Sequence, residues 1–236
     1  MNQASKVIVV TGASQGIGAE VVRAFRGLGH RIVATSRSIR PVDDENILTV
    51  AGDISERGTA ERIITEGLAR FGRIDTLVNN AGNFISKPFT EHSVDDYNAA
   101  MNVNMRGFFH ITQLAIAEME RRRSGHVVTL TTSVDQIAIS GAYTVLAAMT
   151  KGGLNAATKS LAIEYAKKGI RVNAVGPGVI RTPMYAPEAY EALAALQPIG
   201  RMGEPGEIAS AILFLDQSPF ITGEILHVDG GQSAGH

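Results

Sequence analysis

A glycine-rich turn near the start of the chain has the residue types that bind phosphate. Thr11-Gly12-Ala13-Ser14-Gln15-Gly16-Ile17-Gly18 follows the apolar run Val7 to Val10 and precedes a helical pattern. Glycines permit a tight turn and let the backbone approach a pyrophosphate, and the N-terminus of the next helix favours an anion. We therefore predict a dinucleotide site that includes Gly12, Ser14, Gln15, Gly16, Ile17 and Gly18.

The residues after the second and third predicted strands indicate which dinucleotide binds. Ala34-Thr35-Ser36-Arg37 has no acidic residue that would repel a 2′-phosphate. Instead Ser36 offers a hydroxyl, and the guanidinium of Arg37 can bind phosphate with two hydrogen bonds. This favours NADP(H) over NAD(H). Asp53 could accept a hydrogen bond from the adenine amino group, or it could cap the following helix.

Short β-branched runs alternate with longer helical patterns, which predicts βαβ units and a parallel sheet. The predicted strands are Lys6–Thr11, Arg31–Thr35, Ile47–Ala51, Thr76–Asn79, His126–Thr131, Arg171–Val175 and Ile225–Val228. The predicted helices are Gly18–Leu28, Arg57–Phe71, Val103–Arg122, Val145–Ala166 and Pro205–Leu215. Several strands are apolar on both faces, so we predict an α/β fold of three layers, with helices on both faces of the sheet.

The run Arg121-Arg122-Arg123 suits a helix C-terminus that is stopped by Ser124-Gly125.

Composition limits the classes of function. The 236 residues, 44% of them apolar, fit one α/β domain over residues 1–236, with an irregular lid at about 182–202. The net charge of -1 argues against a nucleic-acid binder, and the lack of cysteine excludes thiolate chemistry and disulfides. The histidines show no metal-ligand spacing, so we predict no metal site. No apolar run is long enough for a signal or a membrane span, so we expect a cytoplasmic protein with no membrane partner.

Motifs spread along the chain resemble those of the short-chain dehydrogenase/reductase family. After the glycine-rich turn come Asn79-Asn80-Ala81-Gly82, Asn104 in NVNMRGFF, Ser133 in TLTTSV, Lys151 in TKGGLNAATKSLA, then GPGVIRTPM and TGEILHVDGG. Their order and spacing cover nearly the whole chain. The resemblance implies a Rossmann fold with a seven-stranded parallel sheet, and a tetramer or dimer.

The resemblance also implies roles for the matched residues. Lys151 would hold the nicotinamide ribose, Ser133 would orient the substrate oxygen, and Asn104 would support a proton-relay water beside Lys151. These three are the expected catalytic residues. The implied cofactor contacts, besides Lys151 and the residues named above, are Ile54, Asn80, Ala81, Gly82, Pro177, Gly178, Ile180 and Thr182.

The family's catalytic tyrosine lies four residues before its lysine, and here that position is Ala147. One helical turn would place the two side chains on one face, so an acid that typically contributes about 10²–10⁴-fold is missing. Three alternatives stay open. Tyr143 could replace it, a water held by Ser133 and Lys151, with Asp135, could donate the proton, or the protein could bind cofactor without efficient turnover.

We therefore expect an NADP(H)-dependent oxidoreductase that transfers a hydride to or from a small carbonyl or alcohol, with an atypical proton donor. The alternative is an NADP-binding pseudo-enzyme with a regulatory or scaffold role. Phe84, Ile85, Val134, Met184 and Tyr185 are candidates for an apolar substrate pocket under the lid. Small residues in Val103–Arg122 and Val145–Ala166 are consistent with helix packing between subunits of a homo-oligomer.

Overall fold

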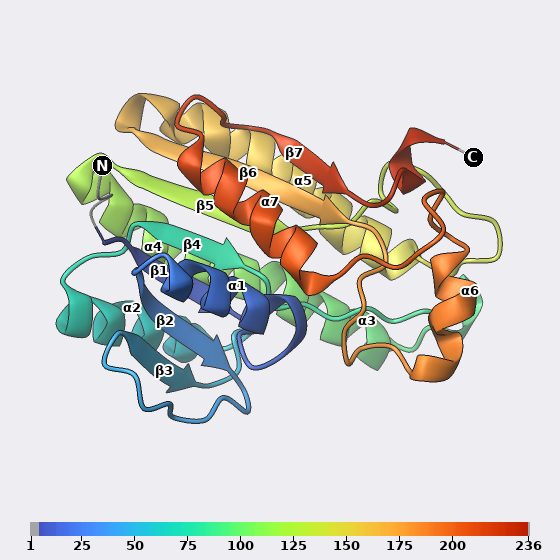
Figure 1. Cartoon of the computed structure of the whole chain (residues 1–236), viewed down its shortest axis with the longest axis horizontal. Helices are drawn as coiled ribbons and strands as arrows, with labels where there is room; N and C mark the ends of the chain where they lie inside the picture. Colours follow the sequence, from blue (N-terminus) through green and yellow to red (C-terminus); the bar gives the residue numbers. More distant parts are fainter. Residues whose placement is uncertain (1–4, 236) are drawn as a thin grey trace.

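Seven β-branched, apolar runs form the strands of one parallel sheet (Figure 1). The structure is a computed structural model and describes residues 5–235. The strands are β1 (Val7–Thr11), β2 (Arg31–Ser36), β3 (Ile47–Ala51), β4 (Thr76–Asn79), β5 (Gly125–Leu130), β6 (Ile170–Pro177) and β7 (Ile225–Val228). Their order in the sheet is β3-β2-β1-β4-β5-β6-β7. The chain thus reverses direction across the sheet between β1 and β4, as in doubly wound dinucleotide-binding folds.

Helices cover both faces of the sheet, and each face has its own core. On one face lie α1 (Gly16–Gly27) and α7 (Pro205–Gln217), whose Phe25 and Ile212 are fully buried against strand residues such as Ile8. On the other face lie α2 (Arg57–Phe71), α4 (Phe108–Arg122) and α5 (Val145–Tyr165). The predicted three-layer α/β fold is therefore confirmed, with strand and helix ends that shift by a few residues.

One predicted helix is wrong in its first part. The expected helix Val103–Arg122 begins as a π-helix, Met101–Gly107, which continues directly from α3 (Val94–Ala100), and α4 starts only at Phe108. The prediction also missed α3, although Ser93 and Asp96 form a capping box at its start. A π-turn keeps the helical residue types and changes only the hydrogen-bond register, so apolar periodicity does not reveal it.

Shorter elements complete the chain, and several of them lie near the carboxyl ends of the strands. Figure 1 shows α3 and α6 (Tyr190–Ala194) on the side to which the strand arrows point. The 3-10 helices are η1 (Phe89–Glu91), η3 (Ala166–Lys168), η4 (Pro187–Ala189) and η5 (Gln232–Ala234). None of the helices within residues 5–235 is long and apolar enough to cross a membrane.

The run Arg121-Arg122-Arg123 does lie at a helix C-terminus, but the predicted stop is wrong. The helix ends at Arg122, its C-cap is Arg123 with a left-handed backbone at φ 51°, and Gly125 already belongs to β5. Arg122 donates to the carbonyl of Ile74 and to the carboxylate of Asp75, which fastens the helix end to the start of β4.

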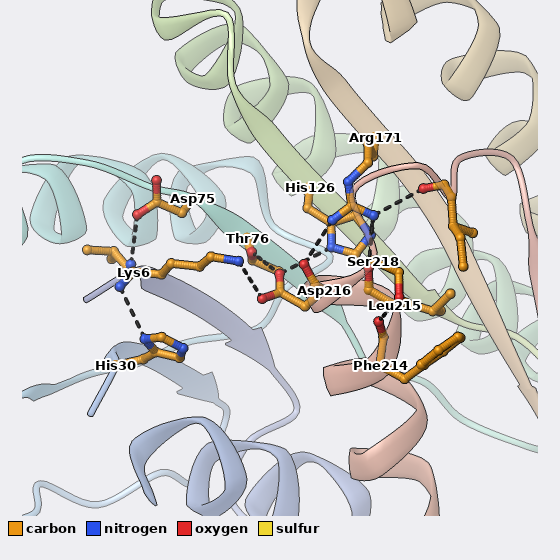
Figure 2. A network of polar contacts seen from close by, with 12 residues as sticks. Lys6, His30, Asp75, Thr76, His126, Arg171, Phe214, Leu215, Asp216 and Ser218 are labelled. Carbon is orange, nitrogen blue, oxygen red and sulfur yellow. Dashed lines mark hydrogen bonds and ion pairs between the residues drawn. The ribbon is translucent and has the colours of Figure 1, made fainter. Parts of the chain in front are cut away.

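A buried polar network occupies the opposite, amino-terminal edge of the sheet. Figure 2 shows Lys6, Thr76 and His126 directed at the carboxylate of Asp216, near the end of α7. Since these residues come from the start of β1, from β4 and from β5, the network joins central strands to α7.

Candidate functional site

A cavity of about 790 Å³ lies at the carboxyl ends of the strands and is lined by the loops that follow β1 to β6. Most predicted site residues meet here. Of the cofactor residues named above, Gly12, Ser14, Gln15, Gly16, Ile17, Ser36, Arg37, Asp53, Ile54, Asn80, Ala81, Gly82, Lys151, Pro177, Gly178, Ile180 and Thr182 all line it. The sequence reasoning therefore identified one connected surface from residues far apart in the chain.

The glycine-rich turn is held in a backbone shape that favours glycine. Gly12 and Gly16 have φ values of 66° and 55°, in the left-handed region. Asn80 donates from Nδ2 to the carbonyls of Thr11 and Gly12 at 2.9 and 3.1 Å, and so fixes the turn to the end of β4. Gly18 lies behind the cavity wall, where an added Cβ would collide with the carbonyl oxygen of Gly12. Its role is to let α1 pack close to the turn.

The loops after β2 and β3 bring Arg37 and Asp53 to the same end of the cavity. The alternative of Asp53 as a helix cap is wrong, because the N-cap position of α2 is Glu56. Asp53 instead accepts from the N–H and the hydroxyl of Ser55, at 2.9 and 2.8 Å. These contacts, with the charge of Arg37, lower the pKa of Asp53. The buried hydroxyl of Thr35, which also lines the cavity, has no hydrogen-bond partner within residues 5–235.

Lys151 on α5 reaches the floor of the cavity. Its ammonium donates to the carbonyl of Leu130 at 2.7 Å, and burial lowers its pKa to about 8. A Cβ added to Gly82 would lie 3.0 Å from Lys151 Nζ, so glycine leaves room for this approach. Glycine at 12, 16 and 82 therefore lets neighbouring segments and Lys151 pack closely around the cavity. The glycine-rich turn, Arg37 and Lys151 line this one cavity, so the residues fit a dinucleotide.

The π-helix positions Asn104 beside this lysine. Asn104 Oδ1 accepts the N–H of Asn83 at 3.0 Å, and Nδ2 donates to the hydroxyl of Thr150 at 3.1 Å. A second cavity of about 10 Å³ is lined by Asn104, Lys151, Asn79 and Thr129 among others, which is close to the space that one water needs.

Ser133 lies at the cavity wall but is fully buried. Its hydroxyl donates to Gln232 Oε1 at 2.5 Å and faces the carbonyl of Pro177 at 3.3 Å. Gln232 Nε2 in turn donates to the carbonyl of Leu196 at 3.2 Å. Because a carbonyl can only accept, the amide nitrogen must face Leu196 and the amide oxygen must face Ser133. Sequence reasoning missed Gln232, since no spacing links it to a serine 99 positions away.

The position of the missing tyrosine faces the cavity. Ala147 lines it one helical turn before Lys151. Tyr143 does not line it and is 51% exposed. Asp135 does not line it either, because its carboxylate accepts from Nδ2 of Asn155 at 2.5 Å, on α5.

The expected apolar pocket is largely present. Phe84, Val134, Met184 and Tyr185 line the cavity, whereas Ile85 does not. Burial raises the pKa of the Tyr185 phenol. The segment that follows β6 continues this wall, and the methyl carbon of Thr182 would lie 3.2 Å from a Cβ at Gly16, so this segment contacts the glycine-rich turn. Within residues 5–235, no cluster of three His, Asp or Glu side chains is arranged to hold a metal ion.

Comparison with known proteins gives matches along almost the full chain. The protein family described as enoyl-(acyl carrier protein) reductase matches residues 12–233. L-fucose dehydrogenase of Mus musculus is 35% identical over 247 residues, covering 98% of this chain and 89% of that protein. The 3-oxoacyl-[acyl-carrier-protein] reductase FabG of Thermotoga maritima is 34% identical over 249 residues, covering 98% of this chain and 99% of that protein.

Solved structures share the whole fold. The structure described as ElxO with NADP bound has a TM-score of 0.91 and 29% identity, and the match covers 98% of this chain and 100% of that chain. The ligand-free aldohexose dehydrogenase of Thermoplasma acidophilum has a TM-score of 0.88 at 29% identity, with 98% and 95% covered. These matches agree with the doubly wound α/β fold of this chain.

Proposed function

Because this chain belongs to the short-chain dehydrogenase/reductase family, we propose that it is an NADP(H)-dependent oxidoreductase of small carbonyl or alcohol compounds with an atypical proton donor. The observation that carries the proposal is the common lining of one cavity by the glycine-rich turn, Arg37 and Lys151. The turn binds the pyrophosphate, Arg37 binds the 2′-phosphate, and Lys151 binds the nicotinamide ribose. The bound cofactor supplies or accepts the hydride.

NADP(H) is preferred because the loop after β2 offers Arg37 and Ser36 where an acidic residue would repel a 2′-phosphate. The structural neighbour ElxO binds NADP, which supports the same preference. Calorimetry should show tighter binding of NADPH than of NADH. Arg37→Ala should reduce NADPH affinity by about 10-fold or more, the scale of one lost charged hydrogen bond, and should leave NADH affinity unchanged.

Arg40→Ala is the matched control for this experiment, since Arg40 is an exposed arginine of the same loop that does not line the cavity. It should leave both affinities unchanged. Equal affinity of the wild-type protein for NADPH and NADH would refute the preference, and no binding of either would refute the proposed function.

The chain's own residues then handle the substrate proton. Asn104, held by Thr150 and the backbone of Asn83, keeps a water beside Lys151 in the cavity of about 10 Å³. This water, in place of a side chain at Ala147, is the source of the proton. NADPH oxidation measured against ketones, aldehydes and quinones tests the activity, and no turnover above the buffer rate with any of them would contradict it.

The second candidate is an NADP-binding pseudo-enzyme with a regulatory or scaffold role. Two observations favour it: Ala147 removes the expected acid, and the hydroxyl of Ser133 is buried against Gln232. This candidate predicts NADPH affinity without turnover. The variant Ala147→Tyr separates the two, because a large gain in carbonyl reduction would mean that the remaining site is competent.

The remaining expectations belong to the same proposal. We place the chain as one domain in the cytoplasm, with residues 182–202 as a lid over the cavity. A homo-oligomer, a tetramer or dimer, would cover the exposed side chains of Phe109 on α4 and of Met149 and Ile163 on α5. Light scattering coupled to size-exclusion chromatography measures this state directly.

A further inference from the structure

The part of the cavity beyond Lys151 has no side chain placed to give a proton to a substrate oxygen. The proton of Ser133 is held by Gln232, and the ammonium of Lys151 donates to the carbonyl of Leu130. Among the cavity-lining residues that the structure describes, no histidine or carboxylic acid lies in this part, and Asp53 is at the 2′-phosphate end. The other donors are aliphatic hydroxyls, which are weak acids, and the phenol of Tyr185, whose pKa is raised further by burial.

The cavity is lined by few charged side chains and by several apolar ones, together with hydroxyls such as those of Ser140 and Thr144. We call the apolar lining residues Phe84, Val134, Ile139, Met184, Tyr185 and Leu193 the inner wall. Among the described lining residues the only cations are Arg37 and Lys151, and both are assigned to the cofactor. A substrate that carries a carboxylate or a phosphate would therefore have no partner on the inner wall, and burying its charge there would be costly.

Because no acid side chain lies near the reacting oxygen, some hydride acceptors should react more readily than others. A hydride that adds to an ordinary ketone leaves an alkoxide, a strong base that needs a proton as it forms. A hydride that adds to a quinone leaves a hydroquinone monoanion, which is a phenolate whose conjugate acid has a pKa of about 10. Because this anion is a much weaker base, it can leave the reaction centre and take its proton from water.

We propose that the hydride acceptor of this site is a neutral, planar quinone bound against the inner wall. The proposal rests on the proposed function. In the step, NADPH held by the glycine-rich turn, Arg37 and Lys151 would supply the hydride and become NADP⁺, and the quinone would gain two electrons and one hydrogen nucleus to become the hydroquinone monoanion. One proton from water completes the hydroquinone. Because Ala147 has no tyrosine ring, the planar substrate has space beside the inner wall.

Kinetics with a matched pair of acceptors test the proposal. With NADPH, the wild-type protein should reduce 2-methyl-1,4-naphthoquinone well above the buffer rate, with no solvent deuterium isotope effect on kcat, and should reduce 1-tetralone poorly. Ala147→Tyr should raise kcat for the tetralone by about 100-fold or more, because a placed acid contributes on that scale, and should raise the quinone kcat much less. Ala147→Phe adds the ring without the acid and should give no gain with the tetralone.

Binding gives a readout that needs no turnover. In the presence of NADP⁺, calorimetry should detect the naphthoquinone, and Val134→Asp on the inner wall should abolish its binding. Val42→Asp, at an exposed position outside the cavity, is the matched control and should keep it.

Each failure has a distinct meaning. NADPH binding without quinone reduction would overturn this inference and leave the cofactor site intact, whereas absence of NADPH binding would refute the proposed function itself. An equal gain for quinone and tetralone in Ala147→Tyr would show that both need a placed acid, and would overturn the inference. A 100-fold loss of quinone kcat in Tyr185→Phe, at unchanged quinone affinity, would identify that phenol as the acid and would overturn it as well.

Discussion

The buried ammonium of Lys151, which we propose binds the cofactor, destabilises the folded protein at neutral pH. Burial lowers its pKa to about 8 from 10.5, so the unfolded chain holds the proton more tightly between these values. The free energy of unfolding should therefore rise as the pH increases from about 8 to 10.5. At neutral pH the folded protein is destabilised, because it holds a charged ammonium in an apolar environment. Among residues 5–235, the contact with the carbonyl of Leu130 is the one hydrogen bond that offsets this cost.

We predict that Lys151→Met stabilises the protein at pH 7 by about 1–2 kcal/mol, since the charge penalty is removed and one hydrogen bond is lost. The same variant should lose most of its NADPH affinity. Urea unfolding and calorimetry measure the two effects. Lys159→Met, on the exposed side of the same helix, is the control and should change neither quantity. A less stable Lys151→Met protein would contradict the argument.

At the scale of elements, the sequence predicted every strand and the five long helices because each is a strongly apolar or periodic run. It missed α3 and the π-helix, since neither a short helix nor a shifted hydrogen-bond register changes that periodicity. For the site, the glycine-rich turn and Lys151 could be found because each lies in a local motif. The contact of Ser133 with Gln232 could not, because only the packing of η5 beside β5 creates it.

The C-cap of α4 has a strained backbone conformation, and the cost of this strain can be measured. Arg123 has φ 51°, a backbone region that costs a non-glycine residue about 1 kcal/mol. Its side chain donates to the carbonyl of Lys167 at 2.9 Å. Arg123→Gly and Arg123→Ala both lose this hydrogen bond, but only glycine relieves the backbone. We predict that the glycine variant is about 1 kcal/mol more stable than the alanine variant, measured by urea unfolding. Equal stability would mean that the conformation is not strained.

At the scale of the whole molecule, polar groups are arranged differently at the two edges of the sheet. The carboxyl edge keeps polar groups and glycines open toward the cavity. At the amino edge, polar side chains form hydrogen bonds with one another around Asp216 (Figure 2). Burial alone would raise the pKa of Asp216, but hydrogen bonds from His126 and Lys6 outweigh it and lower the pKa. The network therefore stays ionised and joins β1, β4 and β5 to α7.

His126 makes this network sensitive to acid. Its Nδ1 faces the Asp216 carboxylate at 3.2 Å, and its Nε2 faces two donors, Asn173 at 3.0 Å and Arg171 at 3.4 Å. Nε2 must therefore be the unprotonated nitrogen that accepts from these donors. In a charged imidazolium Nε2 would carry a hydrogen, and that hydrogen would face the two donors. Burial, only partly offset by Asp216, lowers the pKa of His126 to about 4 from 6.5.

Because the folded-state pKa is depressed, the stabilising contribution of neutral His126 is complete above pH 6.5 and is lost as the pH falls toward 4. The shift corresponds to a loss on the order of 3 kcal/mol. We predict that His126→Asn, whose amide can still donate to Asp216 and is neutral at every pH, is less stable than the wild-type protein at pH 8 but loses less stability between pH 6.5 and 4. Urea unfolding across this range measures both slopes. Parallel slopes would show that another group causes the acid sensitivity, since only the wild-type protein has an imidazole to protonate at this edge of β5.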